Sequence, residues 1–190
     1  MGFSSNGGER TNLFALVFYI PDPLGQFLDD LRRELVPGCL PRAHVTVLPP
    51  RKLSADTGPA IERARAVASE FPPFEIVAGA VEMFPTTDVI FIGIKQGERE
   101  LQEMHRALNQ GPLAFDEPFS YHPHITLAQE LPPGRVQPLF DLARRRWAAS
   151  PHSRLIHAKS ACYVQQTVSC AWVDLAEIPL SGVSVLKRKN

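Results

Sequence analysis

The chain has 190 residues, of which 44% are hydrophobic and 21% are charged, and its 20 basic residues balance its 20 acidic ones. These proportions are ordinary for a globular protein, and the zero formal charge argues against a protein that wraps long duplex nucleic acid, which needs a basic excess. The three cysteines are odd in number and lack metal-ligand spacing, which indicates reduced thiols and a cytoplasmic location. No apolar run reaches the ~18 residues of a membrane helix, so we expect no membrane partner.

The two ends of the chain predict no packed structure. Residues 1–12 are polar and rich in glycine and serine, which indicates a disordered leader, and residues 181–190 form a tail that ends in basic residues. Between them, the length of residues 13–180 fits one domain, or two small lobes that share a core. We therefore expect a single bilobal domain, present as a monomer.

The first half of the chain alternates predicted strands and helices. Residues 13–20 (LFALVFYI) form a short apolar run that ends at Pro21, which predicts a buried strand. Apolar residues then recur at offsets of three and four over residues 24–35, which predicts an amphipathic helix that ends before Pro37-Gly38. The same reasoning predicts a strand at residues 43–48 closed by Pro49-Pro50, a helix at 57–70 and a long strand at 74–84.

The order of elements restarts after a short linker at residues 85–87. Each half then reads strand-helix-strand-helix-strand, with repeat one at residues 13–84 and repeat two at residues 88–178. A linker this short predicts one body with a cleft near a pseudo-two-fold axis, because independent lobes need a longer tether. The elements predicted in the second half are strands at 88–94, 121–128 and 155–164, helices at 98–108 and 137–149, and a final strand at 168–178 that forms a hairpin with its predecessor.

One tetrapeptide pattern occurs twice, as His44–Val47 (HVTV) and as His124–Leu127 (HITL). Side chains alternate between the two faces of a strand, so in each copy the His and Thr share one face and the two aliphatic residues share the other. Two such strands facing each other would place two imidazoles and two hydroxyls around one small anion. Acid–base cleavage of a phosphate ester needs such a set, and needs no metal for it. A single copy is common at sheet edges, whereas two copies in duplicated surroundings are informative.

The doubled motif resembles the two-histidine (2H) phosphoesterase superfamily, and the segment Tyr121–Ala128 (YHPHITLA) is similar to the second motif of its 2′-5′ RNA ligase-like branch. The resemblance covers about residues 13–178. It implies a duplicated α+β fold with antiparallel sheets around a central cleft, and no metal or other cofactor. It also implies cleavage or transfer at phosphodiesters that involve a ribose 2′-oxygen. The implied partner is a nucleotide or a short RNA end with a 2′,3′-cyclic phosphate or a 2′-5′ linkage.

The same resemblance implies roles for four residues. Matched by motif, His44 and His124 would be the acid–base pair, and Thr46 and Thr126 would bind the phosphate through their hydroxyls. Many members of the branch carry a basic residue soon after the second motif, whereas this chain has Gln129-Glu130 there.

Further residues are candidates for substrate contacts, each with a structural alternative. His122 lies on the same strand face as His124 and would line the mouth of the cleft. Tyr163 and Phe84 end equivalent long strands and would pack in the core, with stacking on a base as the alternative that makes Tyr163 a candidate for substrate binding. Four basic residues would either hold a distal phosphate or be solvated: Arg42, Arg51, Arg135 and Lys159.

Two other functions remain open. One is a non-catalytic nucleotide-binding module that uses the same cleft. The other is a metal-dependent hydrolase in which His122 and His124 bind zinc, although no third ligand of suitable spacing accompanies them.

Overall fold

The computed structural model describes residues 9–38, 42–53 and 56–182, and within these ranges it contains two antiparallel sheets and four α-helices. The helices are α1 (Leu24–Leu35), α2 (Thr57–Ala68), α3 (Glu98–Leu108) and α4 (Val136–Ala148). The strands are β1 (Arg10–Tyr19), β2 (His44–Arg51), β3 (Phe74–Met83), β4 (Ile90–Gln96), β5 (His124–Ala128), β6 (Leu155–Ala158), β7 (Ser160–Thr167) and β8 (Trp172–Pro179).

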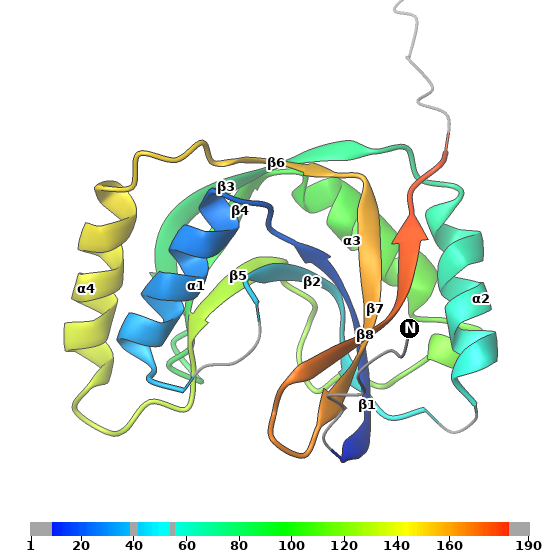
Figure 1. The fold of residues 1–190 in the computed structure, drawn as a ribbon, viewed down its shortest axis with the longest axis horizontal. Helices are drawn as coiled ribbons and strands as arrows, with labels where there is room; N and C mark the ends of the chain where they lie inside the picture. The colour runs from blue at the N-terminus through cyan, green and yellow to red at the C-terminus, as the bar shows by residue number, and fades with distance from the viewer. Residues whose placement is uncertain (1–8, 39–41, 54–55, 183–190) are drawn as a thin grey trace, which may run out of the picture.

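The two sheets have matching strand orders, β2-β1-β7-β8 and β5-β4-β3-β6, and every pair of neighbours is antiparallel (Figure 1). In each sheet a strand with the His-x-Thr pattern lies at one edge, next to the first strand of its own half of the chain. The predicted α+β class with antiparallel sheets is confirmed.

The sheets do not follow the two sequence repeats. β3 belongs to the first repeat but pairs with β4 of the second, and β7 of the second repeat pairs with β1 of the first. The linker explains the first exchange, because a connection this short lets β3 and β4 lie only as antiparallel neighbours. The units 13–84 and 88–178 are therefore repeats of sequence, and the two sheets that form the body each take strands from both.

Several predicted elements differ from the structure, and among them β5 begins at His124 and β8 at Trp172, so residues 121–123 and 168–171 precede these strands. The strand predicted at 155–164 is two strands, because the chain leaves one sheet after β6 and enters the other at β7. β2 continues through Pro49-Pro50 to Arg51, which an edge strand tolerates because proline lacks only the amide hydrogen. β1 begins at Arg10, so the last residues of the predicted leader belong to it. Residues 1–8, together with 183–190 of the predicted tail, lie outside the described ranges.

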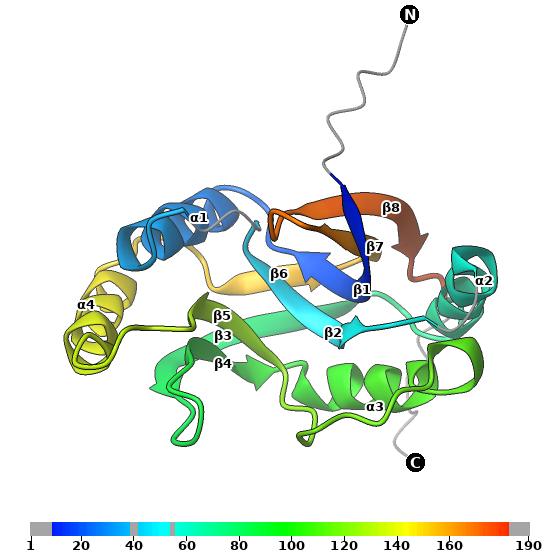
Figure 2. The same cartoon turned by 90° about the horizontal axis from the view of Figure 1, so that it is seen from below.

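The helices cover the two ends of the molecule in pairs that combine the two halves. α1 packs beside α4 at one end, and α2 beside α3 at the other (Figures 1 and 2). The apolar face of each sheet packs against them, and the aliphatic residues of both His-x-Thr strands are at most 1% exposed. Because these aliphatic side chains are buried against the core, the His and Thr side chains that alternate with them lie on the outward faces of β2 and β5.

Candidate active site

The two His-x-Thr strands lie side by side where the two sheets meet (Figure 2). β2 and β5 are the edge strands of their sheets, so no third strand separates them. His44 and Thr46 alternate with buried valines along β2, and His124 and Thr126 alternate with buried aliphatic residues along β5. All four polar side chains are partly exposed on the faces opposite the core. The topology thus brings together two motifs that are 80 residues apart in the sequence (124 − 44).

Both histidines are held in the same orientation by a carbonyl group two residues earlier. His44 Nδ1 is 2.6 Å from the Arg42 carbonyl oxygen, and His124 Nδ1 is 2.7 Å from that of His122. A carbonyl only accepts hydrogen bonds, so Nδ1 carries the hydrogen in each ring and donates it. In the neutral rings Nε2 is then the nitrogen with a free lone pair. Each imidazole can therefore take or give a proton at Nε2.

The surroundings of the two imidazoles favour their neutral forms. The pKa of His44 is lowered to about 4, mainly by burial and in smaller part by Arg32, His124 and Arg42, while the hydrogen bond to the Arg42 carbonyl opposes the shift. Burial also lowers the pKa of His124, and the nearby His122 adds to this effect. Because His124 acts on the pKa of His44, the two rings interact electrostatically across the junction of the sheets. Their protonation states are coupled.

On the His44 side, a polar cluster lies next to the imidazole. The Tyr19 ring is edge-on to His44 with 6.4 Å between centroids, and the Arg42 guanidinium lies 3.6 Å above the centre of the Tyr19 ring. Asp174 accepts from Arg42 at 3.1 Å and from the Tyr19 hydroxyl at 2.6 Å. Tyr19 and Asp174 of this cluster line a groove of about 440 Å³, together with Cys162. Burial raises the pKa of the Cys162 thiol to about 12, so it is not a nucleophile near neutral pH.

On the His124 side, aromatic rings surround the imidazole. Phe84 and Phe91 stack at 4.1 Å, and each presents its ring to His124 at 5.2 Å between centroids. His122 contacts both phenylalanines and lies 6.3 Å from His124. His122 is exposed and precedes β5, which begins at His124.

The strand residue paired with each histidine differs between the two sides. Tyr19 pairs with His44, whereas Gly93 pairs with His124. A groove of about 380 Å³ is lined by Gly93 together with Lys95, Arg154 and Glu82. The Glu82 carboxylate lies over Gly93, where an added Cβ would be 2.5 Å from its oxygen. One groove thus includes Tyr19, the strand partner of His44, and the other includes Gly93, the strand partner of His124.

Two sequence-based predictions about substrate contacts are wrong. Tyr163 is fully buried and stacks on Phe14 at 5.9 Å, so it has no face on which a base could lie. Phe84, at the equivalent strand end, is the partly exposed one beside the site. Arg51 is 1% exposed and binds Glu117 and Asn109, so it is neither solvated nor available to a distal phosphate.

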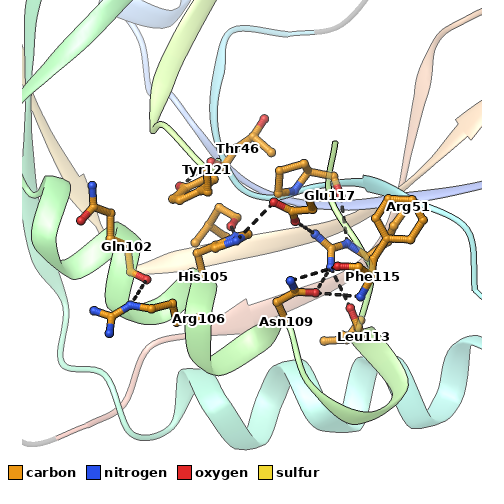
Figure 3. Close-up of polar contacts among 12 residues, drawn as sticks. Thr46, Arg51, Gln102, His105, Arg106, Asn109, Leu113, Phe115, Glu117 and Tyr121 are labelled. Atoms are coloured by element: carbon orange, nitrogen blue, oxygen red, sulfur yellow. Dashed lines mark hydrogen bonds and ion pairs between the residues drawn. The ribbon is translucent and has the colours of Figure 1, made fainter. Parts of the chain in front are cut away.

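A buried polar network beside β2 was not predicted from the sequence (Figure 3). The Tyr121 hydroxyl donates to the Thr46 carbonyl oxygen at 2.8 Å, and the Tyr121 ring stacks on His105 at 4.0 Å. His105 Nδ1 is 3.0 Å from the Val47 carbonyl oxygen, and its Nε2 is 3.4 Å from Glu117. The participants are dispersed in the sequence without periodic spacing, so no local pattern reveals them. Only the position of Tyr121, three residues before His124, is a signal.

No group of three or more His, Cys, Asp or Glu side chains in the described ranges is arranged to hold a metal ion. Within the same ranges, none of the helices combines the length and the apolar composition that crossing a membrane requires.

Comparison with known proteins places the site in a family. Residues 20–153 match the model of the 2′-5′ RNA ligase superfamily. "Putative phosphoesterase BH1439" of Halalkalibacterium halodurans is 30% identical over 90 residues, 46% of this chain and 52% of that protein. A "Putative phosphoesterase" of Geobacillus thermodenitrificans is 28% identical over 99 residues, 47% of this chain and 57% of that protein. The chain thus matches little more than half the length of these two relatives.

Solved structures share the fold. LigT of E. coli, in its complex with 3′-AMP, superimposes with a TM-score of 0.61 at 14% identity, over 92% of this chain and 99% of LigT. A structure described only as a phosphoesterase gives a TM-score of 0.61 at 15% identity, with the same coverage. The family match includes both His-x-Thr strands and more than half of the sequence. The chain therefore belongs to the 2′-5′ RNA ligase superfamily of 2H phosphoesterases.

Proposed function

We propose that this phosphoesterase family member is a metal-independent phosphodiesterase that cleaves or transfers at nucleotide or RNA phosphodiesters involving a ribose 2′-oxygen. The observation that carries the proposal is the matched orientation of His44 and His124. Each imidazole has Nδ1 bonded to a carbonyl and Nε2 left to exchange a proton, and the two lie on adjoining strands. A base and an acid on opposite sides of one phosphate are what in-line displacement at phosphorus requires.

We assign the base to His44 and the acid to His124. Burial lowers the pKa of both rings; Arg32 and Arg42 add to this effect at His44, whereas His122 adds to it at His124. A bound phosphate adds negative charge, which raises the pKa of a nearby imidazole, and His124 is the ring that can gain the proton. Binding of the phosphate thus favours the protonated form of His124, which is the form that acts as the acid.

For a 2′,3′-cyclic phosphate the proton balance is as follows. His44 Nε2 takes a proton from water while the water oxygen bonds to phosphorus. The bond from phosphorus to one ribose oxygen breaks, and that oxygen receives the proton of His124 Nε2. The product is a nucleoside with a 2′- or 3′-monophosphate. The hydroxyls of Thr46 and Thr126 donate to the non-bridging oxygens, where charge accumulates.

The substrate that fits is a nucleotide or a short RNA end. The grooves lined by Tyr19 and by Gly93 have volumes of about 440 and 380 Å³, and we infer that they accommodate the nucleoside part of the substrate. Glu130 follows the second motif and the chain has no net charge, so few phosphates of a long RNA would be neutralised. Binding should therefore depend weakly on salt, with a log–log slope of about −1 to −2.

A turnover screen in excess EDTA tests the proposal. The substrates are 2′,3′-cyclic nucleotides, ADP-ribose cyclic phosphate, and 2′-5′ and 3′-5′ dinucleotides. We expect turnover of at least one substrate with a 2′-oxygen linkage and none of the 3′-5′ dinucleotide. Turnover that EDTA abolishes would favour the metal-dependent alternative with His122 and His124. Tight nucleotide binding without turnover would favour the binding module.

A further inference from the structure

We propose that Tyr121 is a positioning residue, which holds Thr46, and through it the phosphate site, in place relative to the second histidine. The inference rests on the proposed function, because it assigns Thr46 to phosphate binding. Tyr121 itself lies behind β2 and contacts the backbone of Thr46, not its hydroxyl (Figure 3).

The need for such a residue follows from the sheet topology. Among the described residues, β2 is an edge strand that pairs with β1 alone, and β5 is an edge strand that pairs with β4 alone. The two catalytic strands belong to different sheets, so no strand ladder fixes the distance between them. The bond from the Tyr121 hydroxyl to the Thr46 carbonyl oxygen crosses this junction, because Tyr121 lies in the segment that leads directly into β5.

The Tyr121 ring is itself held by a buried stack. His105 lies parallel to it, with 9° between the ring planes, and bonds the next carbonyl of β2, that of Val47. Glu117 faces both His105 Nε2 and the Arg51 guanidinium, and Arg51 binds the Leu113 carbonyl oxygen at 2.7 Å. With His105 7% and Arg51 1% exposed, the support has little freedom to move.

The hydroxyl of Tyr121 is a donor at every pH of interest. Burial raises the pKa of Tyr121, and the negative charge of Glu117 adds to the effect. Loss of the Tyr121 hydroxyl would leave the Thr46 carbonyl oxygen without this hydrogen bond and let β2 shift relative to β5. Displacements of about 1 Å can cost ~10²-fold in rate, so even a small shift is measurable.

The test removes the hydroxyl from two tyrosines, of which one donates a hydrogen bond and the other does not. Tyr121→Phe keeps the ring on His105 and removes the bond to Thr46. Tyr163→Phe is the matched control, because the Tyr163 hydroxyl is buried without a hydrogen-bond partner in the structure. We expect Tyr121→Phe to lower kcat on the best substrate about 10-fold, with a rise in KM that follows its weaker phosphate binding, at a temperature well below its Tm. The Tyr163→Phe variant should match the parent.

A double-mutant cycle separates positioning from general loosening. If Tyr121 acts through Thr46, Tyr121→Phe should change kcat by less than about twofold in a Thr46→Val background, since coupled residues are not additive. An additive loss in that background, or no loss in Tyr121→Phe alone, would overturn the proposal.

A binding readout keeps this outcome apart from a failure of the proposed function. Inorganic phosphate is titrated into each variant and followed through the imidazole resonances of His44 and His124. Tyr121→Phe should weaken phosphate binding, and again only when Thr46 is present. Suppose that the parent protein turns over no substrate, but that Tyr121→Phe still weakens phosphate binding when Thr46 is present and not in the Thr46→Val background. The proposed function then fails and the positioning role stands. If Tyr121→Phe binds phosphate like the parent, the positioning role is wrong.

Discussion

The two histidines have different surroundings, although burial lowers the pKa of both. Arg32 and Arg42 act on His44, whereas His124 lies against two phenylalanine rings and near His122. Similar backbone geometry in the two repeats is thus combined with different neighbours. This difference is the basis on which we propose that one imidazole is the base and the other the acid.

The pH dependence of kcat/KM should show both groups. The base form of His44 exists above its pKa of about 4, so activity falls as the pH drops through that value. The acid form of His124 is lost as the pH rises through its lowered pKa, so the alkaline limb should lie below the ordinary histidine pKa of ~6.5. Replacing His122 with Ala removes a positive neighbour and should move this limb to higher pH. A profile flat from pH 4 to 8 would contradict the assignment.

The threonine hydroxyls should matter less than the imidazoles. Thr46→Val or Thr126→Val removes one neutral donor of several and keeps the β-branched shape, so we expect kcat to fall by at most ~10²-fold. Thr87→Val, at an exposed turn before β4, is the control. Steady-state kinetics on the best cyclic phosphate measures all three. Wild-type kcat in both active-site variants would remove the threonines from the phosphate site.

At the scale of elements, the sequence predicted those helices and strands whose bounds depend on neighbouring residues in the chain. The bounds of α1 and α3 match the prediction, because an apolar stripe and a proline or glycine at the ends define each helix. The break between β6 and β7 was not predictable, since apolar residues continue across Lys159 and the exchange of sheets depends on distant strands. The same limit hid Tyr121 and His105, whose partners come from other elements.

Gly97 is a local feature whose importance follows from its backbone. It precedes α3 with φ of 89°, and an added Cβ would lie 2.6 Å from the Glu75 carbonyl oxygen. Gly97→Ala should therefore destabilise the protein by about 1–3 kcal/mol, which lowers the Tm by roughly 2–4 °C per kcal/mol. Gly58→Ala in α2 is the control, because nothing lies within 4 Å of its added Cβ. Thermal unfolding that is unchanged in Gly97→Ala would contradict this local geometry.

The whole molecule is interlocked by the exchange of β3 and β7 between the sheets. Neither sequence repeat contains a complete sheet, so the sheets should not unfold independently. Trp147 in α4 and Trp172 in β8 lie in different parts of the fold. Variants with one Trp replaced by Phe should show the same urea midpoint by fluorescence and by circular dichroism. Midpoints that differ between the two probes would indicate separable lobes.

The doubled motif was sufficient to predict that the two His-x-Thr strands adjoin, because the duplication ties distant residues to equivalent strands. It did not predict how the two strands are held together, or that Tyr163 faces the core. Those features depend on which sheet each strand joins. The central claim is therefore that His44 and His124 act together, as base and acid, on one phosphate that lies between them.

Turnover of 2′,3′-cyclic nucleotides in excess EDTA, by the parent protein and by single His→Ala variants at positions 44 and 124, tests that claim most directly. We expect metal-independent turnover by the parent and a loss of ~10²–10⁴-fold in kcat for each variant, since each removes one proton transfer. His157→Ala, at an exposed histidine of β6, should retain parental activity. If the parent is active and either active-site variant keeps near-parental kcat, paired-histidine catalysis is wrong.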